Sequence, residues 1–251
     1  MYGRGQQPQM RFGPPLTPPV VQYLIIANLA AFVLQFVMPA FAEFGPVRPY
    51  YMWQLGHLWE PFTYMWMHAG LGHILMNMFA LWMFGSPLAL AWGLRKFLRF
   101  YFVCGIGAGF IIASWPYLIM NLSPEGLLIP TVGASGAIYG VLLAYSLTWP
   151  DRVIALLFPP VTFRAIWLIP GLFVMTAVFG GAGISHIGHL GGVLMGWLYL
   201  RRRGEAGSRT LSLDHLKYRL KRYRMRRKLR SVQLDEWESR RRRQDDDQRL
   251  H

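Results

Sequence analysis

The chain has 251 residues and a formal net charge of +14, and 53% of its residues are hydrophobic. This composition is also found in ordinary globular domains, so the class of protein must be inferred from the order of the residues. The single cysteine, Cys104, excludes an internal disulfide and therefore a dependence on an oxidising compartment.

Taken along the chain, six segments carry almost no charge. An α-helix needs about 20 such residues to cross roughly 30 Å of hydrocarbon, and the fourth and fifth segments are short for this. We therefore predict an all-α membrane protein with six transmembrane helices. The expected spans are residues 20–38, 69–89, 100–120, 135–149, 166–179 and 184–200.

Every second connection between these spans is rich in basic residues, as expected because cytoplasmic loops carry an excess of Lys and Arg. No cleavable signal precedes the first span, which we expect to remain as an anchor. Both termini are predicted to be cytoplasmic, and the short N-terminal arm favours a bacterial plasma membrane. The basic residues of the expected cytoplasmic side are Arg4, Arg11, Arg95, Lys96, Arg99, Arg152, Arg164, Arg201, Arg202 and Arg203.

We expect three parts: a flexible cytoplasmic arm over 1–19, a six-span domain over 20–200 and a basic cytoplasmic tail over 201–251. The tail holds 18 of the 26 Lys and Arg residues. Leu213, Leu216, Leu220 and Tyr223 recur at helical spacing within it, which favours a partly helical tail on anionic lipid headgroups. A solvated tail without a specific partner remains open, and nucleic-acid binding lacks any base-reading motif.

Polar side chains at membrane depth usually face a cavity or one another, because hydrocarbon penalises them. His73 and Asn77 are four residues apart, so a helix places them on one face. Both can donate hydrogen bonds, as a developing oxyanion requires. The alternative is a pair that only hydrogen-bonds between helices.

Ser135 lies in the stretch Gly133-Ala134-Ser135-Gly136, at the start of the fourth span. A serine at a helix start often caps the free N–H groups. The neighbouring glycines favour a second interpretation, in which backbone and substrate approach the hydroxyl closely.

His189 precedes Gly192 and Gly196, a GxxxG pair suited to close helix contact. Packing of this pair against Gly136 and Gly140 would bring His189 within reach of Ser135, the arrangement of a nucleophile and its base. A plain interhelical hydrogen-bond donor is the alternative.

These three groups resemble the motifs of the rhomboid intramembrane serine proteases: an HxxxN pair, a GxSG motif and a histidine followed by GxxxG, in that order. The resemblance implies a six-helix bundle around a water-filled cavity and cleavage of transmembrane protein substrates. It implies Ser135 as nucleophile and His189 as general base. It further implies an oxyanion site formed by the Ser135 N–H, His73 and Asn77, with supporting roles for His68, Gly133, Gly136, Tyr139 beneath the His189 ring, Gly192 and Gly196.

The resemblance also implies that the fifth span and the glycine-rich loop 179–183 correspond to a gate and a cap, for which glycines give easy hinges. His186 could compete with His189 as the base, but only His189 has the glycine spacing. An α/β-hydrolase would need G-x-S-x-G, and a metalloprotease would need a motif such as HExxH; neither occurs. We expect no metal and no cofactor. A haem carrier, an inactive relative that binds membrane clients and a transporter remain alternatives.

Overall fold

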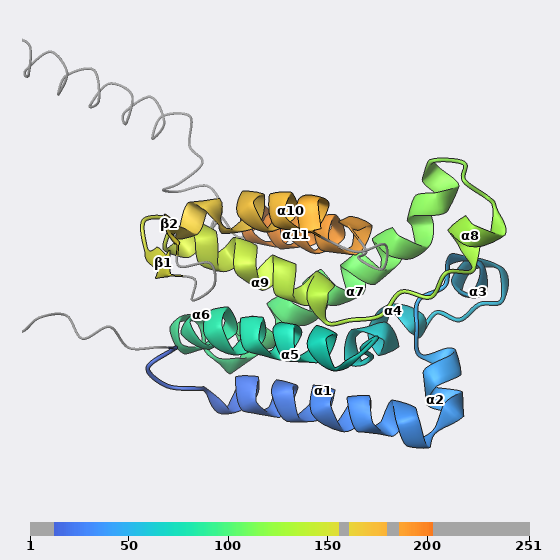
Figure 1. Ribbon diagram of the computed structural model, residues 1–251, viewed down its shortest axis with the longest axis horizontal. Helices are drawn as coiled ribbons and strands as arrows, with labels where there is room; N and C mark the ends of the chain where they lie inside the picture. The colour runs from blue at the N-terminus through green and yellow to red at the C-terminus, as the bar shows by residue number, and fades with distance from the viewer. Residues whose placement is uncertain (1–12, 156–160, 180–185, 203–251) are drawn as a thin grey trace, which may run out of the picture. The chain divides into compact units, whose positions relative to one another are not determined.

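The computed structural model describes residues 13–155, 161–179 and 186–202. The chain divides into two units, Met1–Arg203 and Gly204–His251. Within the first unit the described residues are mainly helical (Figure 1). Most of the expected N-terminal arm, the glycine-rich loop 180–183 and nearly all of the basic tail lie outside the described residues.

The first expected span is α1 (Pro19–Val37), with exposed apolar residues such as Ile26 and Val33. The following connection is not a plain loop. It forms α2 (Pro39–Phe44), α3 (Pro49–Gln54), α4 (Glu60–Thr63) and a 3-10 turn (Tyr64–Trp66). Proline at the first turn starts α2, α3 and α4, because its fixed φ suits a helix and its missing N–H is not needed there.

The second expected span is one helix of 22 residues in three parts: α5 (Leu71–Ala80), a π-helical turn (Leu81–Gly85) and α6 (Ser86–Trp92). Pro87 accounts for the turn. It has no N–H for the carbonyl of Met83 four residues earlier, and its ring crowds that carbonyl, so the helix widens locally.

The third expected span is longer than predicted, because α7 (Leu94–Leu118) begins six residues earlier than the expected start at Phe100. Arg95, Lys96 and Arg99 therefore lie on the helix and not in a connection. Hydropathy finds only the apolar part of such a helix, whereas backbone hydrogen bonds continue beyond it.

The remaining elements are α8 (Pro124–Leu127), α9 (Ser135–Thr148), β1 (Val153–Ala155), β2 (Thr162–Arg164), a 3-10 turn (Ala165–Trp167), α10 (Leu168–Phe179) and α11 (His186–Arg202). The strands form an antiparallel hairpin in which Ile154 pairs with Phe163. This hairpin was not predicted from the sequence. It lies between α9 and α10, where a loop was expected.

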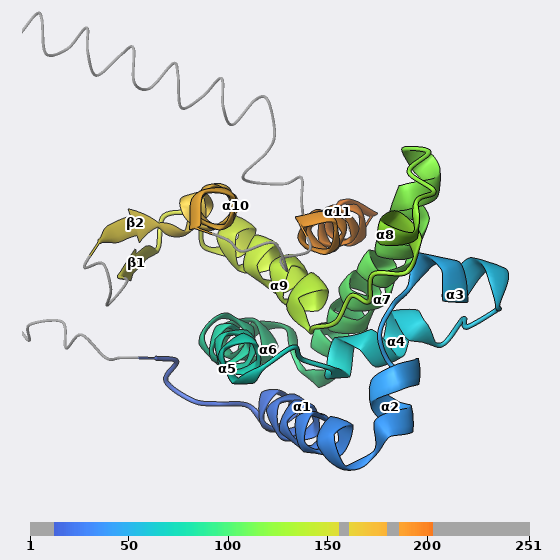
Figure 2. The same cartoon turned by 45° about the vertical axis from the view of Figure 1, so that its right-hand side comes forward.

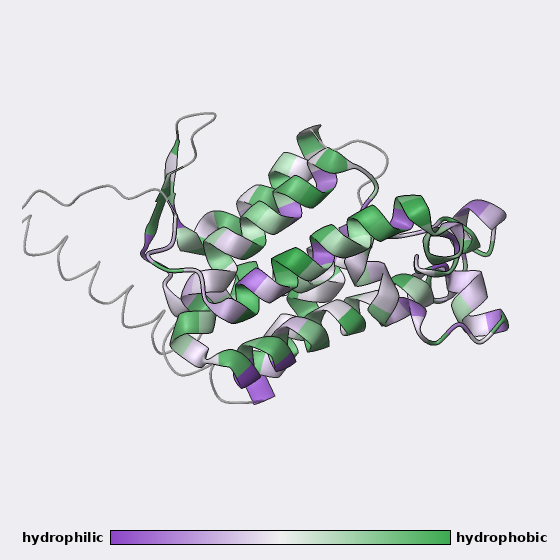
Figure 3. Ribbon diagram, turned by 90° about the horizontal axis from the view of Figure 1, so that it is seen from below, coloured by the Kyte–Doolittle hydropathy of each residue, from purple (hydrophilic) through white to green (hydrophobic). Residues whose placement is uncertain are grey.

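The core is formed by α7, α9 and α11, which contact one another closely, while α1 lies at the periphery (Figures 1 and 2). The helices α7 and α11 run antiparallel, because Gly191 packs on Ala108 and Gly196 on Phe100. Apolar residues dominate the helices in Figure 3.

Each of the six expected spans contains a helix where it is described, but the helices differ in length. Three helices among the described residues are long and apolar enough to cross a membrane: α1, the combined helix Leu71–Trp92 and α7. The helices α9, α10 and α11 have 14, 12 and 17 residues. The chain is thus an all-α membrane bundle, whereas the number of six crossings stays a prediction.

Candidate active site

The turn before α9 places a glycine, Gly133, close to the start of this helix. Gly133 has a φ of +128°, which L residues with a side chain rarely adopt, and its N–H donates to the carbonyl of Tyr64 at 2.9 Å. The helix begins at Ser135, and its N-cap is Ala134, without a side-chain capping bond. The Ser135 hydroxyl therefore does not cap α9.

His73 on α5 faces the same turn. Its Nδ1 accepts a hydrogen bond from the N–H of Ala69 at 3.3 Å, so the ring proton of the neutral imidazole lies on Nε2. A methyl group built on Gly133 would lie 2.9 Å from His73 Nε2 and 3.6 Å from Ser135 Oγ. The His73 ring and the Ser135 hydroxyl thus both lie beside Gly133, and the ring packs so closely on this residue that a side chain there would collide with it.

Asn77 lies one turn after His73 and is buried. Its Nδ2 donates to the His73 carbonyl at 2.8 Å, which uses one of the two amide N–H bonds. The second N–H remains for another acceptor.

His68 precedes α5 and is 1% exposed. Its ring packs edge-on against the ring of His73, with centroids 5.1 Å apart. Both of its ring nitrogens are buried without a hydrogen-bond partner among the described residues. A water molecule or a substrate group could supply that partner.

His189 on α11 lies flat on the ring of Tyr139, with centroids 4.0 Å apart and an interplanar angle of 11°. Tyr139 is four residues after Ser135 on α9, so the imidazole lies about one helical turn from the serine. The neighbouring His186 is exposed. In the part of the chain that the structure describes, no hydrogen bond joins the hydroxyl of Ser135 to the ring of His189.

Glycines allow α9 and α11 to touch through their backbones. A methyl group on Gly192 would lie 1.9 Å from the Gly136 carbonyl oxygen, and one on Gly140 would lie 3.2 Å from the Gly192 carbonyl oxygen. A methyl group on Gly196 would lie 3.2 Å from the Gly140 Cα. The small faces expected to meet are therefore in contact, and this contact holds Ser135 and His189 on adjoining turns.

Two further residues hold this region together. The hydroxyl of Tyr64 donates to the carbonyl of Gly105 on α7 at 2.6 Å, while its carbonyl fixes Gly133. Gln35 on α1 exchanges two hydrogen bonds with the backbone of His68. Neither Tyr64 nor Gln35 was predicted from the sequence. A glutamine inside an apolar span is a signal that could have indicated Gln35.

Residues 55–204 match the family model described as the Rhomboid domain. The chain belongs to the rhomboid family. The resemblance seen in the three motifs is thereby confirmed at the level of the family.

Several rhomboid relatives show how far the similarity extends. Rhomboid protein 1, mitochondrial, of Saccharomyces cerevisiae is 35% identical over 139 residues, which are 53% of this chain and 38% of the yeast protein. Presenilin-associated rhomboid-like protein, mitochondrial, of Homo sapiens is 31% identical over 137 residues, 53% of this chain and 35% of the human one. Rhomboid protease GluP of Bacillus subtilis is 31% identical over 170 residues, 62% of this chain and 29% of GluP. The matched part of this chain thus covers between 29% and 38% of the length of these three relatives.

As a rhomboid with apolar helices of spanning length, the chain is an integral membrane protein. The expected bacterial plasma membrane gains no support from the relatives, since those from yeast and human carry the description mitochondrial.

Proposed function

We propose that this rhomboid is an intramembrane serine endopeptidase that cleaves transmembrane segments of other membrane proteins through Ser135 and His189. The placement of His73 Nε2 and Ser135 Oγ on the same side of Gly133 is the observation that carries the proposal. A hydrogen-bond donor and a nucleophile that lie close together are what acyl transfer to a peptide carbonyl requires. The similarity to a protein described as a rhomboid protease supports the same chemistry.

In the proposed reaction, His189 removes the proton of Ser135 as the hydroxyl attacks the substrate carbonyl. The stacked ring of Tyr139 fixes the plane of the imidazole, which limits the motion needed to reach the hydroxyl. The same imidazole then gives its proton to the leaving amine, and water later releases the acyl-enzyme with His189 again as the base.

The oxyanion formed by the attack needs donors that are in place beforehand. We assign this role to the Nε2–H of His73, to the N–H of Ser135 at the first turn of α9, and to the free amide N–H of Asn77. The N–H of Ser135 has no acceptor within the helix, and the helix dipole favours negative charge at this end. His68 supports the group through its contact with His73.

The substrate must present an extended peptide, because a regular helix holds its carbonyls in the i to i−4 pattern. We therefore expect cleavage close to residues that weaken a substrate helix, with a small side chain next to the cut. We also propose that the chain crosses the membrane six times and that both termini are cytoplasmic. If a protease added from outside removes the tail in inside-out vesicles but not in right-side-out vesicles, this orientation is supported.

Serine and histidine variants test the dyad with controls from the same helices. Ser135→Ala and His189→Ala should each lower cleavage of a membrane-embedded reporter by about 10³-fold or more. Ser146→Ala and His186→Ala should retain cleavage, because Ser146 Oγ donates only to the Leu142 carbonyl and His186 is exposed. The measurement is single-turnover cleavage by purified full-length protein in proteoliposomes. Undiminished cleavage by the Ser135 variant would remove this serine from the mechanism.

A second function, binding of membrane clients without cleavage, is favoured by the missing hydrogen bond between Ser135 and His189 in the described part of the chain. Labelling with a serine-directed fluorophosphonate separates the two functions. A protease is labelled at Ser135, and the label disappears in Ser135→Ala; a client-binding protein stays unlabelled.

A further inference from the structure

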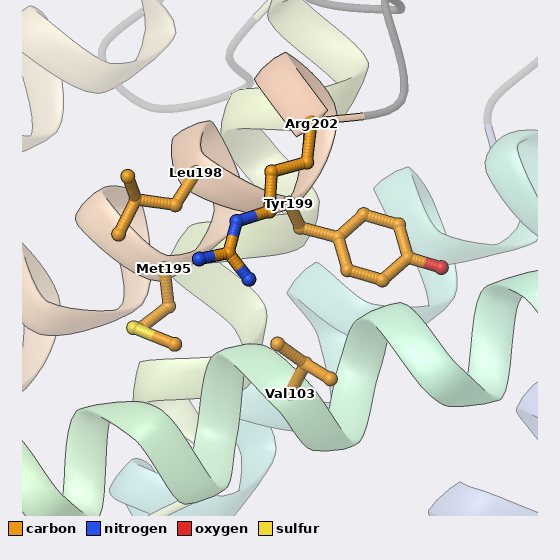
Figure 4. Close-up of a pocket in the computed structure, with 5 residues that line it drawn as sticks. All are labelled: Val103, Met195, Leu198, Tyr199 and Arg202. Carbon is orange, nitrogen blue, oxygen red and sulfur yellow. The ribbon is translucent and has the colours of Figure 1, made fainter.

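A groove between α7 and α11 lies outside the candidate active site. This half-open groove has a volume of about 350 Å³ and is lined by Val103 of α7 and by Met195, Leu198, Tyr199 and Arg202 of α11 (Figure 4). This volume falls within the range of about 300 to 1,000 Å³ that is usual for small-molecule sites. Its walls are mainly apolar, and Arg202 is the one charged residue of the lining.

Two consecutive arginines at the end of α11 differ in their surroundings. The guanidinium of Arg201 lies over the ring of Trp197, at 5.0 Å from its centroid. The guanidinium of Arg202 instead extends over the groove, toward Met195 and Val103 (Figure 4). The ion pairs found among the described residues involve Arg48, His57 and Arg164, not Arg202.

Neither helix supplies an acidic partner, since α7 and α11 contain no Asp and no Glu. They supply a second cation instead. The exposed Arg99 lies four residues before Val103, so it is one turn away on the same face of α7. Because the two helices run antiparallel, Arg99 and Arg202 lie at the same end of the groove.

We propose that this groove binds one phospholipid with an anionic headgroup. An acyl chain lies against Val103, Met195 and Leu198, and the lipid phosphate accepts hydrogen bonds from the planar guanidinium of Arg202. Arginine matches the oxygens of a phosphate with two parallel N–H bonds. Arg99 adds positive potential, which favours a net negative lipid over a zwitterionic one.

The occupant is a membrane lipid, and not a soluble phosphate compound, because the groove is apolar over most of its lining and the chain is an integral membrane protein. This inference does not depend on the proposed protease activity.

The experiment measures lipid that stays bound to the purified full-length protein. Protein is reconstituted in vesicles of phosphatidylcholine with phosphatidylglycerol, extracted in mild detergent and washed in 1 M salt, where the Debye length is only about 3 Å. This wash removes lipid that the basic tail attracts by long-range charge alone. Mass spectrometry of the extract then gives phosphatidylglycerol and phosphatidylcholine per chain.

We expect about one phosphatidylglycerol per chain, and about tenfold less in Arg202→Gln, because a charge-assisted hydrogen bond is lost. Arg201→Gln is the matched control, with the same loss of charge one residue away, and should retain the lipid. Equal loss in both variants, or full retention in Arg202→Gln, would overturn the proposal.

A second pair of variants tests the apolar part without changing any charge. Leu198→Trp fills the groove and should release the lipid, whereas Leu194→Trp, on an exposed part of α11 outside the lining, should not. Retention of phosphatidylglycerol by the Leu198 variant contradicts the groove as the site. Equal retention of phosphatidylcholine by the native chain contradicts headgroup recognition.

Discussion

Gln35 is a polar residue of the mainly apolar helix α1, and both polar groups of its side chain are used. Nε2 donates to the carbonyl of His68 at 2.7 Å, and Oε1 accepts from the His68 N–H at 3.2 Å. The side-chain amide thus binds both backbone polar groups of His68, as the backbone of a neighbouring β-strand would do. Since the ring of His68 packs on that of His73, we infer that α1 positions the candidate oxyanion site through this one side chain.

Replacing Gln35 with methionine keeps the volume and removes both hydrogen bonds. The backbone groups of His68 would lose their partners, at about 1 to 3 kcal/mol for each buried group. We expect kcat for a membrane-embedded reporter to fall about tenfold or more while KM changes little, because in the proposed mechanism His73 stabilises the transition state and not the bound substrate.

Gln22→Met is the control for Gln35→Met in the same helix, because Gln22 is exposed and bonds only to the carbonyl of Thr17. A Gln35 variant with unchanged kcat, or with a rise in KM alone, would show that the contact does not position the site.

At the scale of elements, the contact between α9 and α11 depends on residues without side chains. The backbone of Gly136 touches Gly192 so closely that no atom can be added between them. A carbonyl of a helix cannot move aside as a flexible side chain can, so any added group has to separate the two helices.

Gly192→Ala should therefore destabilise the bundle by at least the roughly 1 to 3 kcal/mol typical of overpacking. It should also abolish cleavage, because His189 moves with α11. Gly171→Ala in α10 is the matched control, since its new methyl group would have no atom within 4 Å. That variant should be neutral or slightly stabilising, as alanine in a helix is favoured over glycine. Thermal unfolding in detergent compares the two, and equal melting temperatures would contradict the close contact.

The sequence predicted the helices and the glycine contact, because hydropathy and small-residue spacing are local patterns. It did not predict the β1–β2 hairpin, the early start of α7 or the π-helical turn. These depend on pairing and on the surroundings of the helix ends. For the site, the motifs indicated His73, Ser135 and His189, but Gln35 meets His68 across 33 residues of sequence, and no spacing rule reports such a contact.

At the scale of the whole molecule, one carboxyl couples stability to pH. Glu60, in the connection between the first two spans, is fully buried. Burial raises its pKa above the usual 4.5, although hydrogen bonds from the Arg48 N–H and the His57 ring act in the opposite direction. The folded protein therefore holds this proton more tightly than the unfolded chain does.

The contribution of Glu60 to stability is thus complete below about pH 4.5 and is lost as the pH rises through the higher pKa of the folded state. Glu60→Gln stays neutral at every pH, so its free energy of unfolding should fall less between pH 4.5 and 7.5 than that of the native chain. Denaturant unfolding in mixed micelles, followed by tryptophan fluorescence at several pH values, measures the difference. Glu43→Gln, at an exposed carboxyl beside Arg48, should keep the native slope. The same slope in the Glu60 variant would disprove the assignment.

The widened turn at Leu81–Gly85 links two distant parts of one membrane helix. One extra residue in a turn offsets everything before it by about 100° relative to everything after it, since a regular helix advances by that angle per residue. The direction in which the imidazole of His73 faces the bundle is therefore set partly by Pro87, fourteen positions away and outside the site. A helix made regular by loss of that ring would aim the same histidine at a different neighbour, so the proline and the histidine are coupled through the geometry of the helix.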